Sequence, residues 1–456
     1  MTLRLHDTAT RGVRDFVPLE AGKASLYLCG LTVQGPPHIG HLRSSVAFDV
    51  LRRWLLHEHY DVTFIRNLTD IDDKIIRKAV EHGVPWWEWA ARNELAVARA
   101  YATLNCLPAS YEPRATAHIP EMITLMQRLI EAGHAYANGA DVFFDVRSLP
   151  DYGALSGQKV DEVQQGEDVV AEDRKRDPRD FALWKAAKEG EPCWPTPWGN
   201  GRPGWHLECS AMAGKYLGAA FDIHGGGRDL VFPHHENERA QSNAAGDGFA
   251  QYWLHNGWVT MAGEKMSKSL GNTLLVDEVV KTHRPVEVRY YLAAAHYRSD
   301  VAYSDESLAR AAASYRGLEG FLRRVHVDSD DDAVLPEGFA AAMDDDLNVS
   351  AALATIFDAV RAGNAALDAR DRATAQRRGA EVAGGLRVLG LHPDDFAGGG
   401  GDAGLVDALM DVVIELRGRA RAGRDFATSD YIRDQLAAAQ VDLMDGPDGT
   451  EWRHGG

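Results

Sequence analysis

Residues 24–41 read Ala-Ser-Leu-Tyr-Leu-Cys-Gly-Leu-Thr-Val-Gln-Gly-Pro-Pro-His-Ile-Gly-His, and this stretch decides the fold class. Its first part, 24–29, is typical of a buried strand, and apolar residues then recur at helical spacing over 39–57. A further apolar run at 62–66 predicts the next strand. A strand, a helix and a strand in so short a stretch predict a parallel sheet with a right-handed crossover.

The motif His38-Ile39-Gly40-His41 stands where the predicted helix begins. The first backbone N–H groups of a helix have no partner within it and the helix dipole is positive there, so this position suits a phosphate group. Gly40 leaves room for a nucleotide to approach the backbone. Taken alone, the motif is equally compatible with two capping or surface histidines.

A second motif, Lys265-Met-Ser-Lys268-Ser269, is flanked by Gly263 and Gly271 and follows a strand predicted over 252–260. Two lysines in a glycine-flanked loop suit a polyphosphate. The alternative is a solvated surface loop, which is the usual place for a pair of lysines.

Together the two motifs match, letter for letter and in order, the HIGH and KMSKS signatures of the class I aminoacyl-tRNA synthetases, which this chain resembles. The resemblance implies a doubly wound, Rossmann-like α/β catalytic domain that activates an amino acid with ATP. It also implies that His38, His41, Lys265 and Lys268 are catalytic. These four residues and Gly40 would bind ATP, with Mg²⁺ accompanying the nucleotide.

A third set of residues has the chemistry of a metal site. Cys29 ends the first strand, Cys209 lies in a helix predicted over 205–217, and His234 and Glu238 are four apart in a helix predicted over 234–245. Two thiolates, an imidazole and a carboxylate are plausible Zn²⁺ ligands. The spacing leaves His235 or His224 open as alternatives. We interpret the remaining cysteines, Cys106 and Cys193, as small buried hydrophobic residues.

Several longer stretches resemble the cysteinyl-tRNA synthetases, and the resemblance runs nearly from end to end. The stretches are 27–33, 67–74, 204–212, 222–229, 232–238, 343–348, and 425 through 434. The resemblance implies one zinc per chain, bound by Cys29, Cys209, His234 and Glu238, with the substrate thiol on the metal. It also places four residues at the cysteine or adenylate pocket: Thr32, Thr69, Trp205 and Asp229.

The domain organisation follows from composition changes and the resemblance. A chain of 456 residues is long enough for two to four domains, and its later part is mainly helical. We expect an α/β catalytic domain with a connective insertion, followed by a helical bundle and a small C-terminal module. The predicted parts are the first half of the catalytic domain at 1–120, the insertion at 121–204, the second half at 205–274, a stem-contact segment at 275–310, a tRNA- and anticodon-binding bundle at 311–396, and a small tRNA-binding module at 405–456.

Charge and hydropathy limit the partners. The 49 Lys and Arg residues against 67 Asp and Glu residues give a net charge of −18, which excludes a generally basic coat for polyanions. A cluster of Arg417, Arg419, Arg421 and Arg424 is a local basic candidate surface. The first residues lack the apolar segment of a secretory signal, and no apolar run reaches membrane-spanning length. We expect a cytoplasmic monomer that does not associate with membranes.

These patterns predict ATP-dependent ligation of L-cysteine to tRNA-Cys through a cysteinyl-adenylate, with zinc selecting the thiol. One alternative is the related cysteine–amino sugar ligase of mycothiol synthesis, against which Asn237-Glu238 and the long tail argue. The other is a non-catalytic, zinc-stabilised RNA-binding protein, which the two intact signature motifs disfavour.

Overall fold

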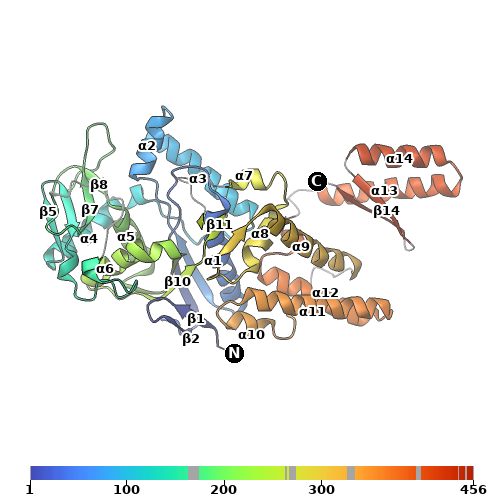
Figure 1. Ribbon diagram of the computed structural model, residues 1–456, viewed down its shortest axis with the longest axis horizontal. Helices are drawn as coiled ribbons and strands as arrows, with labels where there is room; N and C mark the ends of the chain where they lie inside the picture. The colour runs from blue at the N-terminus through green and yellow to red at the C-terminus, as the bar shows by residue number, and fades with distance from the viewer. Residues whose placement is uncertain are drawn as a thin grey trace.

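The structure is a computed structural model that describes residues 2–162, 174–261, 264–265, 274–325, 334–396, 402–439, 441–446 and 449–454. The molecule is elongated, with the α/β part in the middle, the insertion at one end and the C-terminal module at the other (Figure 1).

The centre is a parallel sheet with the strand order β10–β9–β3–β4. Its strands are β3 (Lys23–Leu28), β4 (Asp61–Arg66), β9 (Ala220–Gly227) and β10 (Phe249–Asn256). Helix α1 (Ile39–His57) connects β3 to β4, and Leu26 of β3 pairs with Phe64 on one side and Ile223 on the other. The predicted parallel pair and the predicted helix at 39–57 are therefore confirmed.

The strand predicted over 252–260 is wrong as a single strand. The chain bends at Gly257, and β11 (Val259–Met261) joins a second small sheet with the order β12–β11–β13. The bend brings Gly257 against the backbone, because a Cβ there would stand 2.4 Å from the Ser299 carbonyl oxygen. The partners of β11 are β12 (Glu264–Lys265) and β13 (Val301–Tyr303).

Other elements of the α/β part surround the sheet. An antiparallel sheet at the insertion has the order β5–β6–β7–β8 (Figure 1). The flanking strands and helices are β1 (Arg4–Asp7), β2 (Gly12–Asp15), β5 (Ala135–Asn138), β6 (Asp141–Phe144), β7 (Phe181–Ala186), β8 (Gly201–Pro203), α2 (Asp73–Glu81), α3 (Trp86–Thr103), α4 (Ile119–Glu131), α5 (Trp205–Leu217) and α6 (Glu236–Ala244). Short helical turns are η1 (Ala115–His118), η2 (Val146–Ser148), η3 (Val160–Glu162), η5 (Arg228–Leu230) and η6 (Val231–His235).

The chain after β12 is mainly helical, as predicted. Its helices are α7 (Val276–Val279), α8 (Pro285–Ala294), α9 (Asp305–Val325), α10 (Phe339–Asp344), α11 (Val349–Asp368), α12 (Arg372–Val388) and η8 (Pro393–Phe396). One continuous hydrophobic core joins β3, β4 and α1 to α9, α11 and α12. The Trp54 indole near the end of α1 also donates to the Asp344 carboxylate at 3.2 Å. The catalytic sheet and the helical bundle therefore share α1.

The C-terminal module combines α13 (Asp402–Ala422), α14 (Phe426–Ala438) and a hairpin of β14 (Val441–Gly446) and β15 (Gly449–His454). It extends away from the body (Figure 1). The interpretation of the basic cluster as an open surface is wrong for Arg417, which is buried and contacts both Asp445 carboxylate oxygens at 2.8 and 2.9 Å. This arginine ties α13 to the hairpin.

The sequence also predicts a flexible glycine linker at 398–401 and an acidic break at 328–338. The linker lies wholly, and the break partly, outside the described residues. Within the ranges that are described, no helix combines the length and the apolar composition needed to cross a bilayer.

Candidate active site and metal centre

The four predicted metal ligands come together in a buried cluster beside the end of β3. Cys29 follows β3, Cys209 lies on α5, His234 in η6 and Glu238 on α6, and their ligand atoms all lie within 4.8 Å of one another. The Cys29 Sγ atom is 3.7 Å from Cys209 Sγ and 3.3 Å from Glu238 Oε1. His234 Nε2 is 3.0 Å from the same carboxylate oxygen. Three stretches far apart in the sequence, at the end of β3, on α5 and across η6 and α6, thus build one site.

The helix that was predicted over 234–245 begins later, at Glu236. His234 lies in the preceding turn η6, where Phe232 is extended (φ −139°, ψ 134°). Pro233 explains this, because a proline disfavours helical backbone at the residue before it and lacks an N–H group. The contact between His234 and Glu238 that the four-residue spacing predicts is nevertheless present.

A second group of four overlaps the first. Cys29, His224, His235 and Glu238 also place ligand atoms within 4.8 Å of one another, so both alternatives left open by the sequence are spatially close. His224 Nε2 contacts the other Glu238 oxygen, Oε2, at 2.8 Å. His235 Nδ1 is hydrogen-bonded to His255 Nε2 at 2.8 Å. The two groups share one thiol and one carboxylate and differ in the other two side chains.

Burial and charge set the protonation of the first group. Burial raises the pKa of the Cys29 thiol, and its acidic neighbours raise it further. Burial opposes ionisation of Cys209, but the hydrogen bond from Cys29 and the His234 charge lower the pKa of Cys209 to about 6. Burial opposes the charged forms of both His234 and Glu238. The attraction of His234 for nearby negative charges nevertheless raises its pKa to about 10. The attraction of Glu238 for nearby positive charges holds its pKa well below its usual range. Thiolate, imidazole and carboxylate donors of this kind fit Zn²⁺.

The first signature motif caps α1. His38 is the N-cap residue, with extended backbone (φ −114°, ψ 165°), and its N–H donates to His41 Nδ1 at 3.3 Å. The two imidazole rings stack with their centroids 3.5 Å apart. This arrangement supports the predicted position of the motif at the positive end of a helix dipole.

Backbone hydrogen bonds bring the ends of the second signature segment towards the first motif. Lys265 lies in β12 and pairs with Thr260 of β11. Further along the chain, Leu274 accepts a hydrogen bond from the Ile39 N–H at 3.0 Å, and the Val276 N–H donates to the Pro37 carbonyl at 3.2 Å. Lys268 lies outside the described residues.

The four predicted pocket residues differ in their contacts. Thr32 and Thr69 form a parallel bridge just beyond β3 and β4. The Trp205 ring stacks on the His234 ring, with the centroids 4.0 Å apart and the planes at 19°. Asp229 is exposed and accepts a hydrogen bond from the Trp258 indole at 3.0 Å. Their roles in binding stay predictions.

Three residues near the cluster were not singled out from the sequence. His206 Nδ1 is 3.0 Å from His234 Nδ1, and His255 bonds His235. Glu208 accepts a hydrogen bond from the Thr69 hydroxyl at 3.0 Å, and burial raises its pKa well above the usual value. The available signal was a histidine and a glutamate within the otherwise apolar start of α5.

The two remaining cysteines differ from each other. Cys106 is buried, as predicted, whereas Cys193 is exposed, so its interpretation as a buried hydrophobic residue is wrong. Cys193 lies in a turn-rich segment between β7 and β8, where no core forms around it.

Comparison with known families agrees with this geometry. The model of the tRNA synthetases class I (C) catalytic domain matches residues 15–313, and the DALR domain model matches residues 338–392. The fold and the site thus define a class I tRNA synthetase. Cysteine–tRNA ligases of Streptomyces griseus subsp. griseus and Streptomyces avermitilis are 57% and 56% identical, and each alignment covers 100% of both chains. The chain belongs to the cysteine–tRNA ligase family.

Solved structures show the same fold at low sequence identity. Mycobacterium tuberculosis methionyl-tRNA synthetase in complex with methionyl-adenylate has a TM-score of 0.58 and 17% identity, covering 80% of this chain and 89% of that one. LeuRS of Agrobacterium radiobacter K84, in a ternary complex, has a TM-score of 0.56 and 12% identity, covering 84% and 85%.

Proposed function

We propose that this chain ligates L-cysteine to tRNA-Cys with ATP, through a cysteinyl-adenylate. The observation that carries the proposal is the buried cluster of two thiols, an imidazole and a carboxylate at the end of β3, the strand that precedes the first signature motif. An amino acid must lie there to meet ATP, and this donor set suits selection of a thiol. Membership of the cysteine–tRNA ligase family supports the same reaction.

We assign the zinc ligands to Cys29, Cys209, His234 and Glu238, with one ion per chain. The low pKa of Cys209 favours a thiolate, which zinc prefers over an alcohol. His234 Nδ1 contacts His206, which leaves Nε2 for the metal, as is usual for metal-binding histidines.

In the overlapping group, His224 contacts the second Glu238 oxygen and His235 is bonded to His255. His224 is therefore placed to orient the Glu238 carboxylate, and we assign His234 rather than His235 as the ligand because the resemblance to the cysteinyl-tRNA synthetases places the metal there. Bound here, zinc would supply a preference for sulfur over oxygen, whereas pocket shape alone separates such near-isosteres by only about 10²-fold.

The signature motifs perform the phosphate chemistry. His38 and His41 donate to ATP phosphate oxygens, and Gly40 lets the nucleotide approach α1. The cysteine carboxylate attacks the α-phosphorus, and pyrophosphate leaves. Mg²⁺ bound with the nucleotide would supply further positive charge to the phosphates. Lys265 and Lys268 neutralise the charge that develops on the leaving group. A hydroxyl of the terminal tRNA ribose then attacks the adenylate carbonyl and AMP leaves.

Thr32, Thr69, Trp205 and Asp229 line the pocket for cysteine and its adenylate in this proposal. The Trp205 ring stacked on His234 supports a place directly beside the metal. The monomeric state and the cytoplasmic location stay predictions from the sequence.

The first alternative function differs in the acceptor that receives cysteine, and the second involves no ligation of cysteine. Neither alternative is favoured. The relatives that match over the full chain are cysteine–tRNA ligases, and the DALR domain model matches residues 338–392 of the tail, which ligation to an amino sugar would not require. The test supplies purified protein with cysteine and ATP, and with either tRNA-Cys or an amino sugar. We expect pyrophosphate exchange and esterified tRNA. An amide on the amino sugar would establish the first alternative, and the absence of exchange would favour the second.

Cobalt substitution tests the metal assignment without relying on turnover. With Co²⁺ in place of zinc, added cysteine should intensify the thiolate-to-cobalt absorption band, and added serine should not. An unchanged spectrum with cysteine, together with intact pyrophosphate exchange, would leave the metal a structural role.

A further inference from the structure

We propose that Arg43 is a positioning residue that fixes the two signature motifs relative to each other. Arg43 lies two residues after His41 on α1 and binds the segment between α8 and β13. This segment in turn supports β11, the strand that leads to the second motif. The proposal rests on the proposed function, because it concerns how ATP is held between the two motifs during activation.

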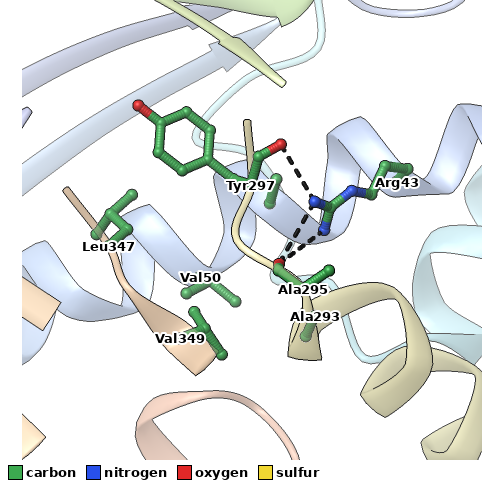
Figure 2. A pocket seen from close by; sticks show the side chains of 8 residues that line it. Arg43, Val50, Ala293, Ala295, Tyr297, Leu347 and Val349 are labelled. Atoms are coloured by element: carbon green, nitrogen blue, oxygen red, sulfur yellow. Dashed lines mark hydrogen bonds between the residues drawn. The ribbon is translucent and has the colours of Figure 1, made fainter. Parts of the chain in front are cut away.

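The guanidinium group of Arg43 is surrounded by main-chain carbonyl groups. It donates through Nη1 to Leu292, and through both Nη1 and Nη2 to Ala295 at 3.4 Å. Nη2 also donates to His296 at 2.7 Å, Tyr297 at 3.1 Å and Ser299 at 3.3 Å. Figure 2 shows the guanidinium aimed at the carbonyl groups of Ala295 and Tyr297. Five carbonyl groups of one short segment thus converge on a single side chain of α1.

The Arg43 guanidinium is a buried positive charge that the dipoles of main-chain carbonyl groups stabilise. Arg43 is 1% exposed, and burial lowers its pKa to about 10, so it stays charged at neutral pH. The last carbonyl groups of α8 carry the negative end of the helix dipole, which favours the cation. The two terminal nitrogens of the planar guanidinium present their N–H donors in a fixed arrangement, whereas a lysine has three donors on one nitrogen at the end of a flexible stem. The site therefore requires arginine specifically.

The opposite side of the same segment supports β11. The Gly257 N–H donates to the Tyr297 carbonyl at 2.8 Å, and the Val301 N–H donates to the Trp258 carbonyl at 2.8 Å. Val259 of β11 then pairs with Val301 of β13. On its other edge β11 pairs with β12, where Thr260 faces Lys265. A continuous path of main-chain bonds leads from Arg43 to the second motif.

The consequence is a fixed separation between two phosphate-binding groups. ATP must touch both motifs as pyrophosphate leaves, and a misplacement of about 1 Å can cost on the order of 10²-fold in rate. Loss of Arg43 should therefore slow activation, while the proposed metal cluster at the end of β3 and on α5, η6 and α6, which binds the cysteine thiol, keeps its geometry.

The main experiment compares Arg43→Lys and Arg43→Met with Arg289→Met. Arg289 is a matched control, because it is also buried (0% exposed) and also ties α8 to α1, through the Asp49 carboxylate at 2.5 Å. It donates to the Leu104, Asn105 and Leu389 carbonyls as well, but it binds none of the 292–299 carbonyls. Measurements are made below the melting range and normalised to folded protein. We expect kcat for pyrophosphate exchange to fall about 10- to 100-fold in both Arg43 variants, more in Met than in Lys. Cysteine affinity and zinc content should stay within about twofold, and Arg289→Met should change kcat by less than about threefold.

A second variant leaves Arg43 intact and perturbs the segment from the other side. In Gly257→Ala the new Cβ would meet the Ser299 carbonyl at 2.4 Å and must displace it, whereas in the control Gly320→Ala on α9 the Cβ meets nothing within 4 Å. We expect Gly257→Ala to reproduce the kinetic pattern of Arg43→Lys. This variant keeps the test decisive if the Arg43 variants do not fold.

Amide hydrogen exchange in the free protein separates this proposal from the proposed function. Arg43→Lys should accelerate exchange at residues 257–261 more than Arg289→Met does, whether or not the wild-type protein activates cysteine. Equal effects of the Arg43 and Arg289 variants on kcat and on amide exchange would overturn the positioning role. A rise in the cysteine dissociation constant as large as the fall in kcat would do the same. If the wild-type protein supports no pyrophosphate exchange, the proposed function fails and the amide data alone decide the role of Arg43.

Discussion

The Glu238 carboxylate contacts three side chains within the buried cluster. Its Oε1 atom lies 3.3 Å from Cys29 Sγ and 3.0 Å from His234 Nε2, while Oε2 is 2.8 Å from His224 Nε2. The Oε1 atom thus faces other proposed metal ligands, whereas Oε2 faces His224, which orients the carboxylate. This division makes Glu238 the most informative single position in the site.

We predict that Glu238→Gln weakens zinc binding by at least about tenfold, because the amide removes the negative charge that a cation needs. Glu236→Gln is the matched control. Glu236 lies on the same helix and is equally buried, but its Oε2 accepts the Ser156 N–H at 2.7 Å and is directed away from the cluster. Zinc affinity is measured by competition with a chromophoric chelator. Equal weakening in both variants would contradict the assignment of Glu238.

A second residue-scale prediction separates the two overlapping groups. Cys209 belongs only to the first group and His235 only to the second. Cys209→Ser should therefore lose most of the bound zinc. His235→Asn should weaken zinc affinity by no more than about tenfold, the smallest effect typical of removing a residue that orients a metal ligand. Metal content after dialysis is the measurement, with Cys193→Ser as an exposed control. Loss of zinc from His235→Asn alone would place the metal in the other group.

At the scale of elements, α1 is clamped to its neighbours by a buried ion pair. Arg289 on α8 contacts the Asp49 carboxylate at 2.5 Å and donates to the Leu389 carbonyl near the end of α12 at 2.8 Å. Arg53 on α1 contacts the same carboxylate at 2.8 Å. Burial opposes ionisation of Asp49, but the two arginines outweigh it and lower its pKa.

We predict that this clamp makes stability depend on acid. A carboxylate with a lowered folded pKa stabilises the protein above its unfolded pKa of about 3.9, and this contribution is lost as the pH falls through the lower folded value. Asp49→Asn should cost about 3 kcal/mol at pH 7.5, because it leaves buried arginines without their partner. Between about pH 5 and pH 3 it should lose less stability than the wild-type protein does. Urea unfolding at each pH is the measurement, and Asp368→Asn, at the exposed end of α11, is the control.

The elements show where sequence reasoning succeeds and where it fails. The helices at 39–57 and 205–217 match α1 and α5, because their apolar spacing and flanking residues are local signals. The strand predicted over 252–260 is interrupted at Gly257, where the backbone of another segment approaches closely. The late start of α6 follows from Pro233, which lies in the preceding turn. Neither effect could be predicted from local apolar spacing. The metal ligands could be named from the sequence, but the choice between His234 and His235 could not be argued from spacing alone. The five carbonyl groups around Arg43 could not be predicted, because the meeting of main-chain groups at one side chain leaves no pattern in the sequence.

At the scale of the whole molecule, α1 connects the phosphate-binding end of the catalytic domain with the helical bundle. The C-terminal module lies beyond that bundle and its elements contact one another (Figure 1). It presents apolar side chains on α13, namely Leu409, Val412 and Leu416, and keeps Arg419 and Arg421 about half or more exposed. The module therefore exposes both apolar and basic side chains on α13.

We predict that truncation after Phe396 preserves pyrophosphate exchange and weakens tRNA charging. The residues of the metal cluster and of the first signature motif all precede the cut, whereas the exposed arginines of the module are lost. Binding of tRNA-Cys should weaken and show a shallower dependence on salt, because fewer phosphate charges are neutralised. Filter binding at several salt concentrations is the measurement. Unchanged affinity and salt slope would exclude the module as a tRNA-binding surface.

The separation of the four proposed metal ligands along the chain has a consequence for biosynthesis. Cys29 and Glu238 are 209 residues apart, so a ribosome adding about 5–20 residues per second needs roughly 10–40 s between them. A compact Cys-x-x-Cys clip can take up metal as soon as it emerges, but the nascent form of this chain holds lone thiols until the catalytic domain is nearly complete. Capture of the ion therefore marks the end of domain synthesis, and intermediates that stall earlier expose Cys29 to oxidation.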